Sequence, residues 1–334
     1  MFVVLIVHKL HVESSQRQLN RLQEMYANLL AGKLSDPNVV IEKPRKDMEY
    51  EALGNAIIDM MAISTLASIS RLRTIARELD LDLYNEKRAM SRSWVERYRA
   101  IEKLGFLKLP ELEPLYCSIL KREKNIHVRT KAIWSLSLIA DENDLDIINS
   151  FLTDPMFASS KYKEFIYSNI IKSFQEYDNE NVFLDLLDEW EDKPQIPVLL
   201  KKDIISACGV VGLISAKDTI KRYHKRYFDV PEMKIACIRA LEKLGDSDMY
   251  PIIVSALLDE DWRVRAVAAK NAEVCSDKII EALESVLRDK NYFVRINAAQ
   301  ALLKSGEKGM AVLTRLTTSD DNFARDMAHY MLSR

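Results

Sequence analysis

The sequence predicts an all-α protein, an α-solenoid in which helical hairpins stack into an α-α superhelix. Three observations predict this class. Only 8 Gly and 9 Pro occur among 334 residues, which is few turn-forming residues for the many turns of a sheet protein. Apolar residues recur with the spacing of one helix face. The same pattern returns every 30 to 38 residues, which is the mark of a repeat array.

Composition limits the classes of function. Hydrophobic residues make up 48% of the chain and charged residues 29%, a balance typical of a protein with a large core. Because 48 Lys and Arg stand against 50 Asp and Glu, we expect no nucleic-acid partner. The 4 Cys residues show no C-x-x-C spacing and no His cluster lies near them, so we expect neither a metal site nor a disulfide framework. We also expect no cofactor.

The repeat is clearest where Arg99–Gly105 returns as Arg239–Gly245 with one conservative change. Extending this alignment divides residues 90–334 into seven hairpins and a final half-repeat. In each unit, apolar or small residues follow the starting position by three, four, seven and ten places, as on one helix face. A second amphipathic stretch follows, and one hairpin cannot bury both apolar faces, so neighbours must stack. The starting positions are Trp94, Arg129, Lys163, Lys201, Lys234, Arg265, Arg295 and Arg325.

The first 90 residues are organised differently. Residues 1–34 are predicted to contain an apolar N-terminal stub followed by one long helix over residues 9–32. Residues 47–89 are predicted to form a divergent helical pair that caps the solenoid. The predicted domains are therefore 1–34, 47–89 and 90–334.

The N-terminal stub predicts a membrane contact. Met1–Val7 is purely apolar, and Lys9, Arg17 and Arg21 follow it. This order is typical of the cytoplasmic end of a membrane helix under the positive-inside rule. Seven residues cannot span a hydrocarbon core of roughly 30 Å, so we interpret the stub as part of a longer tether. The alternative is a short segment folded back on the cap.

Two segments near the C-terminus carry a recognisable pattern, Asp261–Ala269 (DWRVRAVAA) and Phe293–Leu302 (FVRINAAQAL). They resemble HEAT repeats, in particular the short type shared with bilin-lyase-like proteins. The whole layout also resembles bacterial HEAT-repeat proteins that have an N-terminal membrane anchor and occur beside polysaccharide-synthase-type glycosyltransferases. This resemblance implies a cytoplasmic helper of surface-polysaccharide synthesis at the inner face of the membrane, with a membrane glycosyltransferase as its protein partner.

Catalytic signatures are absent from the sequence, including G-x-G-x-x-G, the P-loop, G-x-S-x-G and H-E-x-x-H. Cys208, Cys237 and Cys275 fall on the predicted buried stripe, which favours packing over chemistry. We therefore predict a noncatalytic protein-protein interaction scaffold without catalytic residues. Two alternatives stay open: an enzyme of the bilin-lyase type, and a DNA-binding HEAT protein similar to the alkylpurine glycosylases.

Recurring arginines predict a structural ladder. Arg129, Arg265 and Arg295 each follow an acid six residues earlier. This spacing predicts an acid in the turn between repeats beside the guanidinium at the start of a helix. Because the feature returns with the period of the repeat, we interpret it as structural.

One charged feature occurs once, the stretch Lys221–Tyr227 (KRYHKRY) on the second helix of its repeat. Its four Lys and Arg residues repel one another on two helical turns unless anionic groups face them. The segment Glu176–Asp192 contains eight acids and no Lys or Arg, so the two helices could neutralise each other. The functional interpretation is a binding site for a charged protein segment. The candidate partner-binding residues are Lys221, Arg222, Tyr223, Lys225, Arg226 and Tyr227.

Overall fold

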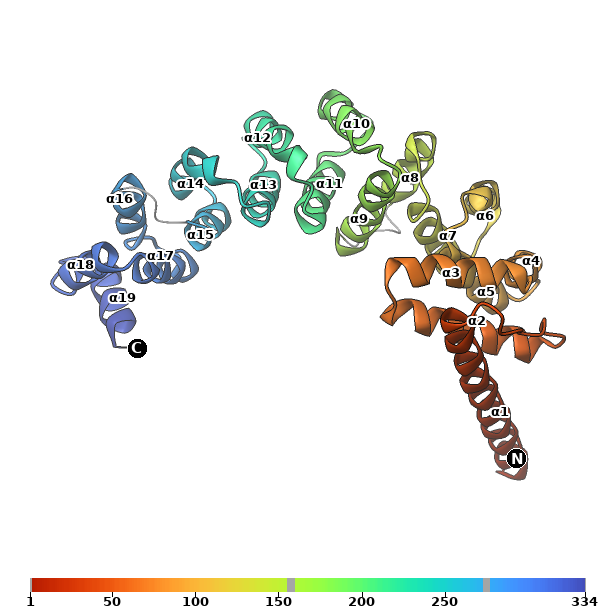
Figure 1. The fold of residues 1–334 in the computed structure, drawn as a ribbon. Coiled ribbons are helices and arrows are strands. Elements are labelled where there is room, and N and C mark those ends of the chain that lie inside the picture. The colour runs from red at the N-terminus through yellow and green to blue at the C-terminus, as the bar shows by residue number, and fades with distance from the viewer. Residues whose placement is uncertain (1, 155–159, 273–276, 334) are drawn as a thin grey trace. The chain divides into compact units, whose positions relative to one another are not determined.

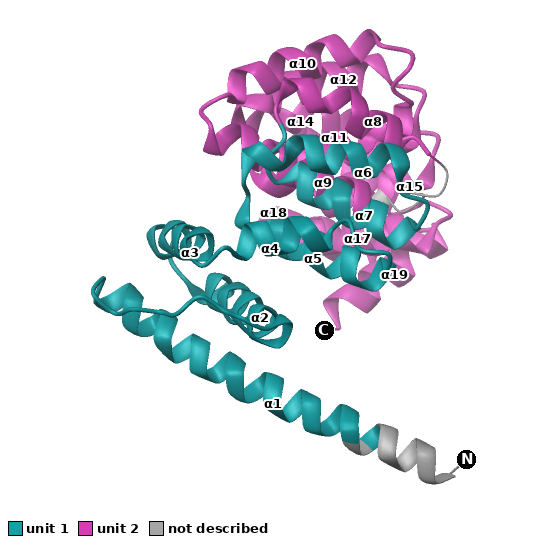
Figure 2. Ribbon diagram, turned by 90° about the vertical axis from the view of Figure 1, so that its right-hand side faces the viewer, with its two compact units in different colours: residues 1–140 teal, residues 141–334 magenta. Residues whose placement is uncertain are grey.

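The computed structural model describes residues 2–154, 160–272 and 277–333 (Figure 1). Every regular element within these ranges is a helix and none is a strand, so the predicted all-α class is confirmed. The chain divides into two compact units, residues 1–140 and 141–334 (Figure 2). The finer division at residues 34, 47, 89 and 90 stays a prediction.

Unit 1 opens with a helix longer than the predicted 9–32 segment. The predicted tether Met1–Val7 falls on residues whose side chains lie outside the described set. In the part of the chain that the structure describes, no helix combines the length and the apolar character needed to cross a bilayer. The helices of unit 1 are α1 (Phe2–Ser35), α2 (Asp47–Ile63), α3 (Leu66–Glu78), α4 (Leu81–Arg88), α5 (Trp94–Leu107), α6 (Glu113–Arg122) and α7 (Ile126–Ser137).

Residues 47–89 form three helices, whereas the sequence suggested a pair. Thr65 separates α2 from α3, because its hydroxyl accepts a hydrogen bond from the backbone N–H of Ser68 and caps the new helix. Asp80 separates α3 from α4, since its φ of 56° is left-handed and cannot continue a right-handed helix. Both breaks are local, and neither alters the hydrophobic spacing from which a pair was predicted.

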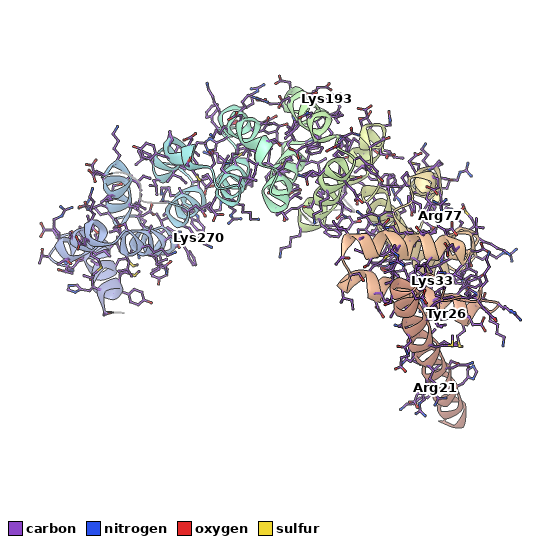
Figure 3. The ribbon with its side chains drawn as sticks, in the orientation of Figure 1. Arg21, Tyr26, Lys33, Arg77, Lys193 and Lys270 are labelled. Carbon is purple, nitrogen blue, oxygen red and sulfur yellow. The ribbon has the colours of Figure 1, made fainter. Side chains whose placement is uncertain are left out.

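The end of α1 is fixed by basic side chains. Arg71 donates hydrogen bonds to the carbonyls of Lys33 and Leu34, at 3.1 and 2.6 Å, which lie in the last turn and lack partners within the helix. The Nζ of Lys33 donates to the carbonyl of Val39 at 3.1 Å and so holds the connector against α1 (Figure 3). These bonds anchor α1 on α3 at the end far from the N-terminus.

A buried ion pair joins α2 to the first repeat. Lys103 on α5 is only 6% exposed, and its Nζ lies 2.6 Å from a carboxylate oxygen of Glu51 on α2. The two helices approach closely at Gly54, where an added Cβ would lie 2.9 Å from the Lys103 side chain. Burial lowers the pKa of Lys103, and the Glu51 carboxylate opposes that change. Helix α5 therefore contacts α2 through a buried charge that depends on the opposite charge of Glu51.

Unit 2 is an arc of two rows of helices (Figure 1). The first helices of the hairpins, α9, α11, α13, α15 and α17, make its inner row, and α10, α12, α14, α16 and α18 make its outer row. The helices are α8 (Leu145–Leu152), α9 (Ser160–Glu176), α10 (Glu180–Asp192), α11 (Val198–Val211), α12 (Lys217–Arg226), α13 (Pro231–Lys243), α14 (Tyr250–Leu257), α15 (Trp262–Lys270), α16 (Asp277–Val286), α17 (Tyr292–Lys304), α18 (Glu307–Leu316) and α19 (Asn322–Leu332).

Small residues let the first helices stack closely. An added Cβ on Gly209 of α11 would lie 2.7 Å from the Cα of Ala240 on α13. The alanine pairs predicted from the repeat pattern, Ala268–Ala269 and Ala298–Ala299, are fully buried. A continuous apolar core runs through the last repeats, as a stack of hairpins requires.

The arginine ladder is present, with a different partner from the one that the spacing suggested. The guanidinium of Arg265 donates to the backbone carbonyls of Asp259 and Glu260, at 2.7 and 2.9 Å, in the turn before its own helix. Its other nitrogens donate to both carboxylate oxygens of Asp289 in the following turn, at 2.5 and 3.1 Å. Arg265 therefore links two successive turns, and Asp259, the acid six residues before it, pairs with Lys234 of the preceding repeat.

The same contacts correct the register of the first unit. Arg97, not the predicted start Trp94, donates to both carboxylate oxygens of Glu123, at 2.7 and 3.0 Å. Arg97 lies four residues after the N-cap Ser93, as Arg265 lies four after the N-cap Asp261. The similarity of residues 99–105 to residues 239–245 is therefore displaced by three residues from the structural equivalence.

The chain closes with a single helix, α19, that matches the predicted half-repeat in position. Ala328 packs in the core, whereas the neighbouring His329 is exposed. The Nε2 of His329 lies 3.1 Å from the carbonyl oxygen of Thr317.

Candidate functional site

The basic helix α12 lies in the outer row of unit 2 (Figure 1). Its two tyrosines serve packing. Tyr223 is 1% exposed, and its hydroxyl donates to the carbonyl of Leu187 on α10 at 2.6 Å. The hydroxyl of Tyr227 donates to the carbonyl of Glu191 at 2.6 Å and accepts a bond from Lys201 at 2.9 Å. Tyr223 and Tyr227, two of the predicted binding residues, are therefore held by hydrogen bonds to backbone carbonyls of α10.

Acids on α10 and in the turn after α13 face three of the four cations in Lys221–Tyr227. Arg222 pairs with Asp188, and Arg226 lies 3.5 Å from Asp192. Lys221 lies 2.9 Å from a carboxylate oxygen of Asp246. This carboxylate accepts a hydrogen bond from the Lys221 ammonium and so raises the pKa of Lys221. The neutralisation that the sequence offered as one interpretation is thus present in the structure.

Lys225 differs from the other three cations. Its side chain is exposed, and within the described ranges no carboxylate lies within the 4.0 Å of an ion pair. Arg226 is also mostly exposed, at 60% of its side chain, and its partner Asp192 is exposed at 81%. An ion pair in such a setting contributes little, at most about 1 kcal/mol. Lys225 and Arg226 are therefore the part of the basic stretch that a partner could reach.

A second surface lies on the inner row, where α9, α11 and α13 enclose a groove of about 390 Å³. Its floor includes the apolar side chains of Ile235 and Ala236, and its rim is charged. Lys202 on this rim pairs with Asp203 at 2.5 Å. The lining residues are Lys161, Glu164, Lys202, Ser206, Glu232, Ile235, Ala236, Arg239, Ala240 and Lys243.

Exposed aromatic side chains form a third surface, which we call the aromatic edge: Trp262, Tyr292, Phe293 and Phe323. They lie at the N-terminal ends of α15, α17 and α19 and are 42 to 59% exposed. The rings of Trp262 and Phe293 are stacked, with centroids 6.2 Å apart and planes inclined by 22°. The guanidinium of Arg295 lies over Phe323, 4.4 Å from the ring centroid.

The aromatic edge arises where the ladder ends. Asp289 is the carboxylate partner of Arg265. The equivalent position in the next turn is Ser319, so Arg295 has no carboxylate partner from that position. Its guanidinium stacks on Phe323 instead. The sequence analysis missed this surface, although an aromatic residue stands two or three places before the repeated arginine in consecutive units. That recurrence was the available signal.

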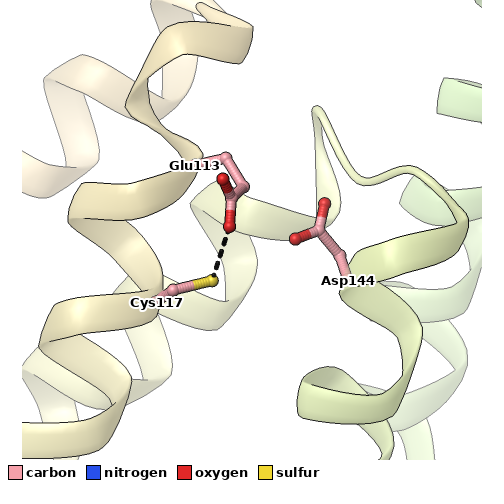
Figure 4. A group of neighbouring side chains, drawn as sticks. All are labelled: Glu113, Cys117 and Asp144. Carbon is pink, nitrogen blue, oxygen red and sulfur yellow. Dashed lines mark hydrogen bonds between the residues drawn. The ribbon is translucent and has the colours of Figure 1, made fainter.

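The cysteines occupy two kinds of environment. Cys208 and Cys237 are buried as predicted, and burial raises the pKa of both thiols, that of Cys208 to about 12. Cys275 lies outside the described residues. Cys117 on α6 is half-buried, and its thiol donates a hydrogen bond to Glu113 at 3.1 Å (Figure 4). The two buried thiols are protonated at neutral pH and make poor nucleophiles.

Comparison with known proteins gives one match in sequence. No family model matches the chain. A segment of 80 residues is 38% identical to the bilin biosynthesis protein MpeU of Synechococcus sp. (strain WH8020). The match covers 22% of this chain and only 27% of the relative's length.

Two solved structures are similar over most of this chain, at low TM-scores. The complex of CpcE and CpcF of phycocyanin lyase from Nostoc sp. PCC7120 is 15% identical, with a TM-score of 0.26. The alignment covers 88% of this chain and 98% of that one. Kap121p is 10% identical, with a TM-score of 0.38, and the alignment covers 94% of this chain and 45% of the other.

The sequence match corrects one prediction. The absence of catalytic motifs led to the prediction of a chain that is not an enzyme. A relative named for bilin biosynthesis, 38% identical over 80 residues, overturns it. The sequence contains no motif of known hydrolases, nucleotide-binding proteins or metalloenzymes, but a helical-repeat enzyme need not contain any of them. The absence of these motifs therefore does not exclude catalysis.

Proposed function

We propose that the protein is an enzyme of bilin metabolism, of a lyase-like type built on HEAT-like helical repeats. The observation that carries this proposal is the 38% identity over 80 residues with a bilin biosynthesis protein. Because the match spans about a quarter of that relative, the substrate and the reaction of this chain are part of the proposal.

The aromatic edge supports the proposal, because a bilin is a flat conjugated tetrapyrrole that stacks on aromatic rings. Trp262 and Phe293 already lie nearly parallel, so a conjugated ring stacked on one of them lies nearly parallel to the other as well. Each aromatic contact contributes about 0.5–1.5 kcal/mol beyond the area that it buries. The nearby guanidinium of Arg295 adds a positive charge for the propionate groups that bilins carry.

Coexpression in cells that make biliverdin tests the proposal. The wild-type protein is expected to purify with a visible absorbance band, and the W262A/F293A variant to purify with little or none. The F228A/L258A variant is the control, because it also removes two exposed apolar side chains, 72 and 69% exposed, that are not part of the aromatic edge. Colourless wild-type protein, or equal colour in all three proteins, would contradict the proposal.

A second candidate function is partner binding by α12, and the exposed Lys225 favours it. The partner implied by the sequence resemblance is a membrane glycosyltransferase, which would bring the protein to the inner face of the membrane. Reversing Lys225 and Arg226 to Glu should abolish copurification of that enzyme from the native host. Thermal stability should hardly change, since exposed charges contribute little. Unchanged recovery of the glycosyltransferase by the K225E/R226E variant would dismiss this candidate.

A further inference from the structure

The inner row of unit 2 carries a series of cations in repeated positions. Arg239 lies nine residues after the N-cap Val230, and Lys270 lies nine after the N-cap Asp261. Equal distance from the start of equivalent helices places both side chains on the same face. Figure 3 shows Lys270 on the inner side of the arc, and Arg239 lines the groove there.

A second position repeats in the same way. Lys243 and Lys304 each lie thirteen residues after the N-caps of α13 and α17. Lys243 lines the same groove as Arg239. All four of these cations are exposed, and none has a carboxylate within 4.0 Å among the described residues. We call Arg239, Lys243, Lys270 and Lys304 the inner cations.

The acids near the inner cations do not neutralise them. Glu232 in the groove already pairs with Arg263, whose Nη1 lies 2.9 Å from the carboxylate Oε1 of Glu232. Glu164 lines the groove on α9, and Glu242 is exposed on α13. This contrasts with the stretch Lys221–Tyr227 in the outer row, where acids pair with three of the four cations. Positive charge is therefore left available on the inner row.

We propose that the inner cations bind an extended acidic segment of a partner protein. First helices that pack side by side lie about 8–10 Å apart. An extended chain advances about 3.3 Å per residue, so carboxylates at every third residue would meet the cations of successive helices. Charge complementarity along a repeated spacing thus defines the partner, independently of the bilin proposal.

The interspersed acids favour a peptide over a nucleic acid. Glu164 and Glu242 lie on the helices that carry or border the inner cations. They would repel the unbroken phosphate series of a single strand, whereas a peptide can place neutral residues opposite them. The neutral residues between successive carboxylates can also reach the apolar floor at Ile235 and Ala236.

The test uses the full chain and a fluorescent peptide of six Glu-Gly-Ser repeats, with binding followed by anisotropy at low salt. We expect saturable binding that the R239E/K243E variant weakens at least about tenfold. The matched control is K278E/R288E, which makes the same change of charge at exposed residues of α16 and its following turn. The control should stay within about twofold of wild type, and circular dichroism should show all three proteins folded.

Three results would overturn the proposal. The peptide could fail to bind the wild-type chain, both variants could lose affinity equally, or an oligothymidylate of the same length could bind more tightly than the peptide. As a further check, a peptide of Lys-Gly-Ser repeats should prefer R239E/K243E over the wild type. None of these outcomes depends on bilin binding, which is read from absorbance.

Discussion

Replacing Glu51 by Gln should destabilise the junction between α2 and α5. The substitution keeps the shape of the side chain but removes the charge that faces the Lys103 ammonium, which is 6% exposed. Removing one member of a fully buried ion pair costs about 3–5 kcal/mol. Glu51 itself is 26% exposed, and partial hydration of this site reduces the expected cost to about 2–3 kcal/mol.

Hydrogen exchange of the amides in α2 and α5 measures this cost locally, without assuming that the whole chain unfolds at once. The E51Q/K103M variant is the decisive control, because methionine fills the space of the lysine stem without its charge. It should recover most of the lost stability. In E51Q the loss should also shrink above the usual pKa of lysine, about 10.4, where the side chain becomes neutral in both states. Protection in E51Q within about 0.5 kcal/mol of wild type would refute the reasoning.

Two further predictions concern the repeats. Asp289→Ala should cost about 2 kcal/mol of local stability, measured by hydrogen exchange in α15 and α17, while Asp320→Ala, which removes an exposed acid, should cost little. Burial opposes ionisation of Asp289, but hydrogen bonds from Arg265 outweigh this and lower its pKa, so the difference between wild type and D289A should begin to shrink below a pH of about 4 and be lost as the pH falls through the lowered pKa. Gly209→Ala should lower the melting temperature, because the new Cβ would meet the backbone of Ala240, at a cost of about 1–3 kcal/mol. Gly32→Ala, where the new Cβ has ordinary space, should not lower it; a lower melting temperature for both variants would count against this account of the stack.

Helical periodicity was enough to predict the class of fold and the hairpin repeat. The alanine pairs at Ala268 and Ala298 were predicted correctly because tight stacking selects small side chains at fixed places. Local sequence similarity was less reliable for register. Arg99–Gly105 and Arg239–Gly245 look alike, yet the capping residues Ser93 and Val230 place them three residues out of step.

The candidate site was harder to predict, because charge along a sequence does not reveal what lies across the stack. The stretch Lys221–Tyr227 stands out as basic, but Tyr223 is buried and three of its cations face acids. The inner cations are the opposite case. Arg239 and Lys270 are isolated in the sequence, and only their equal distance from two helix starts brings them onto one face.

Titration of biliverdin into the purified protein tests the proposed function most directly. The account predicts a saturable change in the absorbance spectrum of the bilin with wild-type protein. Loss of two stacking rings should remove at least about 2 kcal/mol, so W262A/F293A should bind about 30-fold more weakly, with F228A/L258A unchanged. No spectral change with the wild type, or the same affinity in W262A/F293A, would contradict a role of the aromatic edge in bilin metabolism.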